Sequence, residues 1–148
     1  MSYQETKQIV SFIGSIVIFG LYCLYVFQNY PQSAMDSTDA FSFWGAVILI
    51  LIPVSVVAKI VILIGFSIVY RIVSKEKEPA FSDERDKLIE LKATRNSHYA
   101  FVLGFLLAMG SLVLDKPTAT MFVILLLSGI VSEMIGVMTQ LVLYRRGF

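Results

Sequence analysis

The chain has 148 residues, of which 57% are hydrophobic and 16% are charged, and its mean hydropathy is +0.77. A soluble domain has about 45–50% apolar and about 25% charged residues, so this composition excludes an ordinary soluble domain. The formal net charge is only +1, and we expect no nucleic-acid partner.

Four stretches reach the length that a helix needs to cross a membrane, which is roughly 20 residues for a hydrocarbon core of about 30 Å. They cover about residues 8–28, 43–70, 83–114 and 118–144. The third is strongly apolar only from about residue 97, but no Pro or Gly interrupts residues 83–103. We therefore expect one continuous helix that begins in the cytoplasm. The sequence predicts an all-α integral membrane protein, with residues 1–148 forming a single bundle of four transmembrane helices.

The first two helices carry little polar chemistry. The first apolar stretch is too long for the apolar part of a signal peptide and lacks a small-x-small cleavage site, so we expect a retained helix. Cys23 is the only cysteine, which excludes an intramolecular disulfide framework and a cysteine-based metal site. Phe41, Phe43 and Trp44 open the second helix, and we predict that they form an aromatic anchor at the membrane interface.

The positions of the Lys and Arg residues predict the topology, because these residues favour the cytoplasmic side of a membrane. Residues 71–95 hold seven of the twelve, two more follow at the C-terminal end, and the loop at 29–42 has none. Ten of the twelve fit a multi-pass protein whose two termini and central segment are cytoplasmic. We expect it in the cell membrane.

Two opposite charges, Lys59 and Glu133, lie inside the second and fourth apolar stretches. Each precedes an arginine at the membrane boundary, Arg71 or Arg145, by twelve residues. At 1.5 Å per residue both lie about 18 Å from that boundary, so they share one level of the membrane. An isolated charge there costs at least about 2.5–3.5 kcal/mol. One interpretation is a buried ion pair that fixes how the two helices meet, and the other is a proton or cation site at Glu133 that is gated by Lys59.

Small and polar residues near these charges favour burial under both interpretations. Ser55 lies one turn from Lys59. The side of the last helix that carries Glu133 also carries Gly129, Ser132, Gly136 and Gln140. The spacing of Ser128, Ser132 and Gly136 is typical of a seam where two membrane helices pack closely.

The third helix begins with a dense block of charges of both signs. Ser82 is its predicted N-cap, and Asp83 and Glu84 fall in the first turn, where the helix dipole favours anions. At about 100° per residue, Asp83, Asp86 and Glu90 lie on one side. That side continues through small residues typical of helix packing, which are Ser97, Ala100, Gly104, Ala108 and Ser111.

Several groups could balance this acidic side. Within the chain the candidates are Arg71, Arg145 and Arg146, which are expected at the same membrane surface. A divalent ion or a basic partner protein would serve equally. Alternatively, the block is a solvated helix start whose Lys and Arg side chains contact anionic lipid head groups.

The block resembles a known motif. It is similar to the segment Asp-Glu-Arg-Asp-x-x-Ile-x-x-Lys-Ala-x-Arg of small four-helix prokaryotic membrane proteins that are classed only as a domain of unknown function. The matching residues are Asp83, Glu84, Arg85, Asp86, Ile89, Lys92, Ala93 and Arg95. The resemblance implies the same order of helices, with the motif entering the third one. It implies no activity, but members look like companions of small helix-turn-helix regulators, which suggests a regulatory role.

No residues form a recognisable catalytic or metal-binding pattern. His98 is the only histidine, and there is no nucleophile–base set, phosphate loop or zinc motif. We therefore expect no catalytic residues, metal, cofactor or enzymatic activity. The sequence favours a regulatory or accessory protein of the lipid bilayer, whose charged residues at 83–95 contact a protein partner. The alternative is a small ion- or proton-coupled transporter or channel that uses Glu133 and Lys59, and its narrow bundle would require a homo-oligomer.

Overall fold

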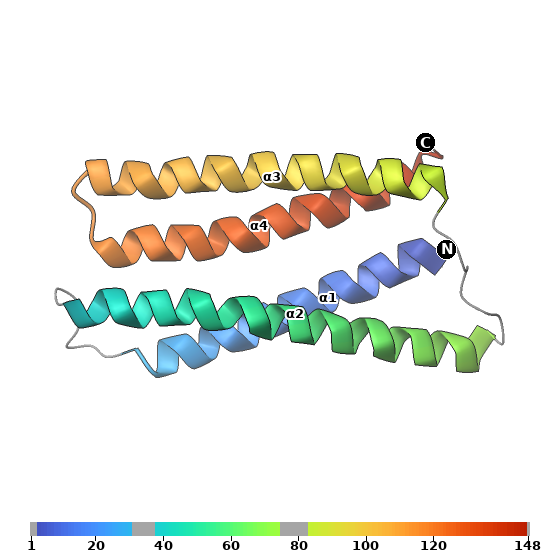
Figure 1. Cartoon of the computed structure of the whole chain (residues 1–148), viewed down its shortest axis with the longest axis horizontal. Coiled ribbons are helices and arrows are strands. Elements are labelled where there is room, and N and C mark those ends of the chain that lie inside the picture. The colour runs from blue at the N-terminus through green and yellow to red at the C-terminus, as the bar shows by residue number, and fades with distance from the viewer. Residues whose placement is uncertain (1–2, 31–37, 75–82, 148) are drawn as a thin grey trace.

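The protein is all-α, and its four helices lie lengthwise beside one another (Figure 1). The computed structural model describes residues 3–30, 38–74 and 83–147. The helices are α1 (Tyr3–Gln28), α2 (Thr38–Ser74), α3 (Glu84–Val113) and α4 (Thr118–Arg145). Each is long and apolar enough to cross a membrane. This confirms the prediction of a helical bundle with four helices capable of spanning a membrane.

The first two helices extend beyond the apolar stretches that predicted them. The second was expected at about 43–70, but α2 has 37 residues. At 1.5 Å per residue it is about 55 Å long, which exceeds a hydrocarbon core of about 30 Å. Apolar length marks only the part of a helix that lipid can surround, whereas the backbone hydrogen bonds continue into polar residues. For the same reason α1 begins at Tyr3 instead of near residue 8.

The helices form two antiparallel pairs that meet through α4. α3 packs along α4, α1 packs along α2, and α4 also contacts both α1 and α2 (Figure 1). Within the described ranges, α3 contacts no helix other than α4. The first residues of α1, the end of α4 and the start of α3 lie at one end of the molecule. The turn at 114–117 lies at the other end.

The turn between α3 and α4 is closed by backbone hydrogen bonds. The N–H of Asp115 donates to the carbonyl of Leu112, and the N–H of Lys116 donates to that of Ser111, both at 3.1 Å. This is the Schellman arrangement, in which the residue after the helix cap is left-handed and is usually Gly. Here it is Asp115, with φ of 53°, and Asp tolerates this conformation better than most residues. Pro117 then precedes α4 directly.

Small residues bring α3 and α4 into close contact, as the sequence predicted. Gly104, Ala108 and Ser111 of α3 are buried, and a side chain at Gly104 would collide with Ser128 of α4. The hydroxyl groups of Ser97 and Ser132 lie 3.1 Å apart across the same interface. Close approach of two backbones strengthens dispersion contacts, which drive helix association where lipid replaces water.

The prediction that Trp44 is part of an aromatic anchor at the membrane interface is wrong. Trp44 is only 4% exposed, and its ring stacks on Phe122 of α4 with centroids 6.0 Å apart. It belongs to a core cluster with Val26 of α1 and Val47 of α2, whereas Phe41 stays 55% exposed. A helix that is apolar on all sides gives no sequence signal to separate lipid-facing from buried positions. The burial of Trp44 therefore becomes visible only when α1, α2 and α4 are packed together.

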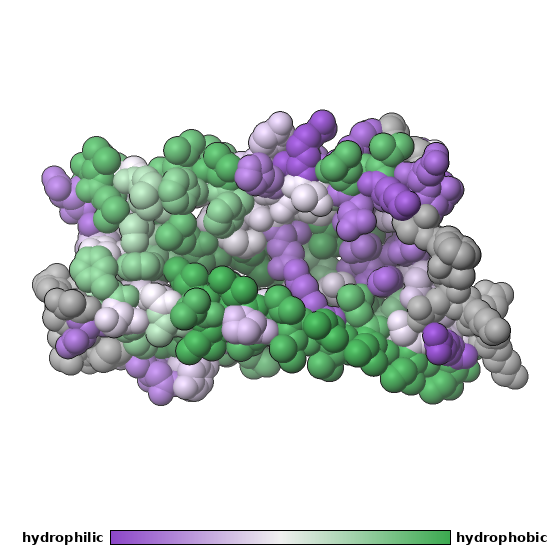
Figure 2. Space-filling model, viewed as in Figure 1, coloured by the Kyte–Doolittle hydropathy of each residue, from purple (hydrophilic) through white to green (hydrophobic). Residues whose placement is uncertain are grey.

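The outer surface is mainly apolar along the helices. Large hydrophobic side chains on all four helices are exposed, among them Leu21, Leu49, Val61, Leu107 and Leu127. Figure 2 shows this apolar surface spreading along α2, while hydrophilic side chains gather at the end where α3 begins. A surface of this kind is suited to lipid instead of water.

Candidate functional site

Lys59 and Glu133 meet at the junction of α2 and α4. Lys59 Nζ lies 2.8 Å from Glu133 Oε1, which is a typical length for a charge-assisted hydrogen bond. The two helices run in the same direction, so residues at equal distances from Arg71 and Arg145 lie at the same level along the bundle. The side chains are 44% and 28% exposed, respectively. This ion pair links α2, which packs along α1, to α4, which packs along α3.

A cavity of about 290 Å³ adjoins this ion pair. Its walls come from α1, α2 and α4, and most of them are aliphatic side chains together with Phe19 and Gly129. The polar groups on the wall are those of Ser15, Ser55, Lys59 and Glu133. This volume lies just below the range for ligand pockets, which is about 300–1,000 Å³.

Ser15 is a member of this site that the sequence did not reveal. It is buried, and its hydroxyl has no hydrogen-bond partner in the described structure. Ser55, by contrast, donates to the carbonyl of Leu51 at 2.7 Å. The only available signal was a polar residue inside the apolar stretch at 8–28, which holds no charged residue that would set its depth.

The other polar residues expected beside Glu133 divide between two faces of α4. Gly129 lines the cavity with Glu133. Ser132 instead meets Ser97 of α3, and Gly136 also lies opposite Ser97. The carbonyl oxygen of the Gln140 side chain is buried and has no partner in the described part of the chain. A single predicted side of α4 therefore serves two interfaces.

The charged start of α3 is capped by Asp83. Its side chain accepts a hydrogen bond of 2.7 Å from the N–H of Glu84, and Asp86 also lies in the first turn. The predicted N-cap, Ser82, lies outside the described residues. Carboxylates at this end interact favourably with the helix dipole.

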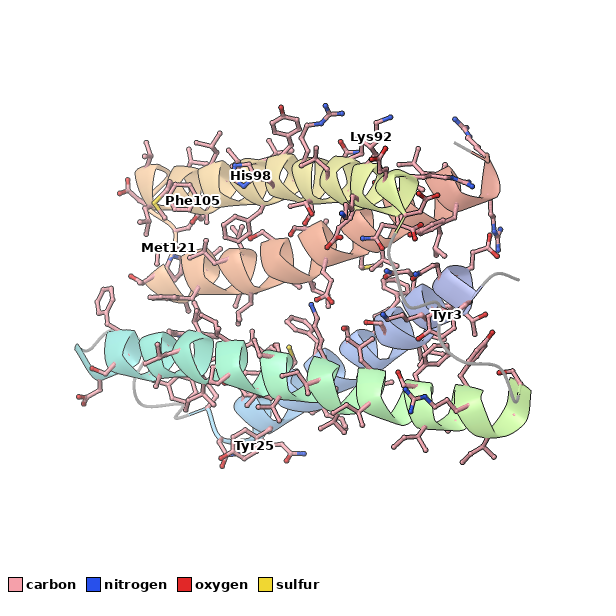
Figure 3. The ribbon with its side chains drawn as sticks, turned by 45° about the vertical axis from the view of Figure 1, so that its right-hand side comes forward. Tyr3, Tyr25, Lys92, His98, Phe105 and Met121 are labelled. Atoms are coloured by element: carbon pink, nitrogen blue, oxygen red, sulfur yellow. The ribbon has the colours of Figure 1, made fainter. Side chains whose placement is uncertain are left out.

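The motif residues divide into a buried face and an exposed face. Ile89 and Ala93 are 0% and 1% exposed, so they form the tightest part of the α3–α4 contact at this end. Figure 3 shows Lys92 on the side of α3 turned away from α4. The exposed charged residues of the block are Asp83, Glu84, Arg85, Lys87, Glu90 and Arg95.

The acidic side is less buried than its alignment with the small residues predicted. Asp86 is half-buried and accepts a hydrogen bond from the hydroxyl group of Tyr144 on α4, while Glu90 is exposed. Within the described residues, neither carboxylate lies at ion-pair distance from Arg145 or Arg146. The packing face is centred on Ile89 and Ala93, because burying these residues leaves no charge unsolvated.

No three His, Cys, Asp or Glu side chains lie together as a metal site in the described ranges. His98 is exposed and lies beside Tyr99, with ring centroids 6.5 Å apart.

A scan of protein-family models finds no match to this chain, and neither a curated protein nor a solved structure matches it.

Proposed function

We propose that this chain is a non-enzymatic regulatory or accessory membrane protein that contacts a partner protein through the charged start of α3. The observation that supports this best is the exposure of that segment. α3 is covered by α4 on one side only, and its charged side chains at 83–95 are mostly exposed. The similarity of these residues to the motif of small four-helix membrane proteins also favours a regulatory role.

The proposed topology places this surface in the cytoplasm. Residues 71–95, which include the end of α2 and the start of α3, hold seven of the twelve Lys and Arg residues, and these residues favour the cytoplasmic side. The start of α1 and the end of α4 lie at the same end of the bundle (Figure 1). Both termini would then face the cytoplasm of a prokaryotic cell, where a soluble or membrane-bound partner could reach α3.

The mixed charges favour a protein partner over lipid alone. Anionic head groups attract Lys and Arg side chains but repel carboxylates, and Glu84 and Glu90 are exposed among the cations. Leu88 and Leu91 are also 52% and 66% exposed. A surface that combines both charges with apolar side chains matches a complementary protein surface.

We expect the double charge reversal Glu84→Lys/Glu90→Lys to weaken capture of a partner from native membranes at least tenfold, which corresponds to about 1.4 kcal/mol. Affinity purification after mild cross-linking, with the partner quantified by mass spectrometry, measures this. Asp86 is left intact because Tyr144 binds it.

Two control variants distinguish a lost partner contact from a lost fold. Lys116→Glu changes charge at the other end of the bundle and should retain the partner. Tyr144→Phe removes the hydrogen bond to Asp86 without altering the exposed charges, and it should also retain the partner. Equal recovery of the same proteins with the double reversal would contradict the proposed contact.

A coupled transport function is the second candidate, and the cavity beside Glu133 favours it. In a homo-oligomer the cavity would form part of a pathway, with Glu133 carrying a proton or cation and Lys59 competing for the carboxylate. Proteoliposomes loaded with a pH-sensitive dye should then show proton flux, or with a cation-sensitive dye cation flux, that falls at least tenfold with Glu133→Gln. Glu90→Gln is the matched control and should leave the flux unchanged. If the wild type shows no flux, or if Glu133→Gln does not change it, this function is ruled out.

A further inference from the structure

A groove with basic residues lies between the start of α1 and the end of α2, which are at the same end of the bundle (Figure 1). Its volume is about 350 Å³. Lys7 of α1 and Arg71 of α2 contribute its two charges, and Ser67 of α2 contributes a hydroxyl group. The rest of the lining of this basic groove is aliphatic and consists of Leu63, Ile64 and Ile68.

Aromatic contacts hold the two helices together beside the basic groove. The ring centroid of Tyr3 lies 4.7 Å from that of Tyr70 and 5.5 Å from that of Phe66. Lys7 lies one turn after Tyr3, and its Nζ lies 5.9 Å from the centre of the same ring, which is within the range of about 6 Å for a cation–π contact. The side chain of Lys7 is therefore directed towards the first turn of α1, as helical side chains usually are.

The charges that line the basic groove have one sign. No carboxylate is among its described lining residues, and Glu5, the one acid of α1, is not part of it. Neither Lys7 nor Arg71 forms an ion pair with another residue in the described part of the chain. Basic pockets between membrane helices attract the head groups of anionic lipids, because each cation near the membrane surface adds to the attraction.

The aliphatic lining favours a lipid over a soluble anion. Ile64 and Ile68 are 55% and 53% exposed, and they lie between Arg71 and Lys59 on α2. Arg71 itself lies about 18 Å from the level of Lys59, at the charged end of the bundle. A phosphate beside Arg71 would therefore have its acyl chains next to Ile64 and Ile68, along the part of α2 that is suited to lipid. The aliphatic lining would add nothing to the binding of a soluble anion.

We propose that the basic groove binds the phosphate of an anionic phospholipid. Arg71 and Lys7 bind the phosphate oxygens, and the Ser67 hydroxyl donates to them. A guanidinium group suits phosphate because it can donate two parallel hydrogen bonds. One acyl chain lies along the aliphatic lining. The groove lies on α1 and α2, whereas the proposed partner contact lies on α3 and the proposed ion site lies at Glu133, so its test is independent of both proposed functions.

Native mass spectrometry of the full chain in detergent, titrated with palmitoyl-oleoyl phosphatidylglycerol, measures the affinity for the first bound lipid. Lys7→Gln/Arg71→Gln should weaken this affinity about 30-fold, which converts to about 2 kcal/mol, because both cations that attract the phosphate are lost. Arg145→Gln/Arg146→Gln is the matched control. It removes two exposed arginines at the same end of the bundle but outside the groove, and the affinity should be unchanged.

A second variant neutralises the basic groove without removing its cations. Ser67→Asp places a carboxylate in the groove that Lys7 and Arg71 line, and it should also weaken binding of phosphatidylglycerol about 30-fold. An acid four residues before an arginine is a stabilising pair on a helix, so this variant should fold at least as well as the wild type. Circular dichroism and gel filtration establish that each variant is folded.

Two further ligands identify the chemistry of the occupant. Palmitoyl-oleoyl phosphatidylcholine, whose ammonium group cancels the charge of its phosphate, should bind about tenfold more weakly than phosphatidylglycerol. Glycerophosphoglycerol, which is the same anionic head group without acyl chains, should not displace the lipid at equal concentration. Equal affinity for the two lipids, displacement by the free head group, or an equal loss of affinity in Arg145→Gln/Arg146→Gln would overturn the proposal.

Discussion

Replacing Lys59 with methionine should destabilise the protein by about 2–3 kcal/mol. The substitution leaves the Glu133 carboxylate without its counter-ion at a level where lipid surrounds the helices. Removing one partner of a fully buried pair typically costs about 3–5 kcal/mol, and we expect less here because the two side chains are 44% and 28% exposed. Unfolding by SDS in mixed micelles, followed by circular dichroism, measures the difference.

The double variant Lys59→Met/Glu133→Leu is the matched control. It removes both charges and keeps side chains of similar volume, so most of the lost stability should return. Well-packed apolar replacements of a buried pair are often neutral or stabilising. If Lys59→Met alone were as stable as the wild type, the ion pair would have no part in holding α2 against α4.

Replacing Gly104 with alanine should destabilise the α3–α4 contact by about 1–3 kcal/mol, the usual effect of overpacking. The new methyl group would collide with Ser128, both at its Cβ and near its backbone. The helices must then separate along the seam on which α3 depends, since α4 is the only helix that it contacts in the described structure. The same unfolding measurement applies.

Two variants test this explanation. Gly110→Ala lies on the same helix but meets open space, so it should be neutral or gain about 0.5–1 kcal/mol, the advantage of alanine over glycine in a helix. Ser128→Gly should recover much of the loss when combined with Gly104→Ala, because it removes the colliding side chain. Equal stability of Gly104→Ala and Gly110→Ala would show that the seam tolerates expansion.

The features predicted successfully from sequence are those that follow from periodicity and length. Apolar stretches located four helices because lipid-exposed residues must be continuous over the thickness of the membrane. Small residues at helical spacing located the α3–α4 seam around Gly104, Ala108 and Ser111. The same helical arithmetic placed Lys59 and Glu133 at one level, where the structure joins them.

The features that were missed depend on which helix lies beside which. Trp44 was assigned to the membrane surface because aromatic residues at helix ends usually lie there, but α4 covers it with Phe122. Ser15 acquires meaning only through the cavity that α1 forms with α2 and α4. Asp86 meets a tyrosine instead of an arginine, since the choice among nearby residues of α4 depends on the rotation of α3 about its axis.

The order in which the helices are synthesised gives the Lys59–Glu133 pair a further consequence. In a membrane, the ribosome would deliver α2 with its lysine to the bilayer well before α4 exists, so the first helical pair would enter with an uncompensated ammonium group. The lysine would cost about 2.5–3.5 kcal/mol on insertion scales, and α2 can bear this cost because it holds the most apolar of the four candidate spans. Insertion of α4 would then remove the cost, so the last helix would stabilise the second only after both are in the bilayer.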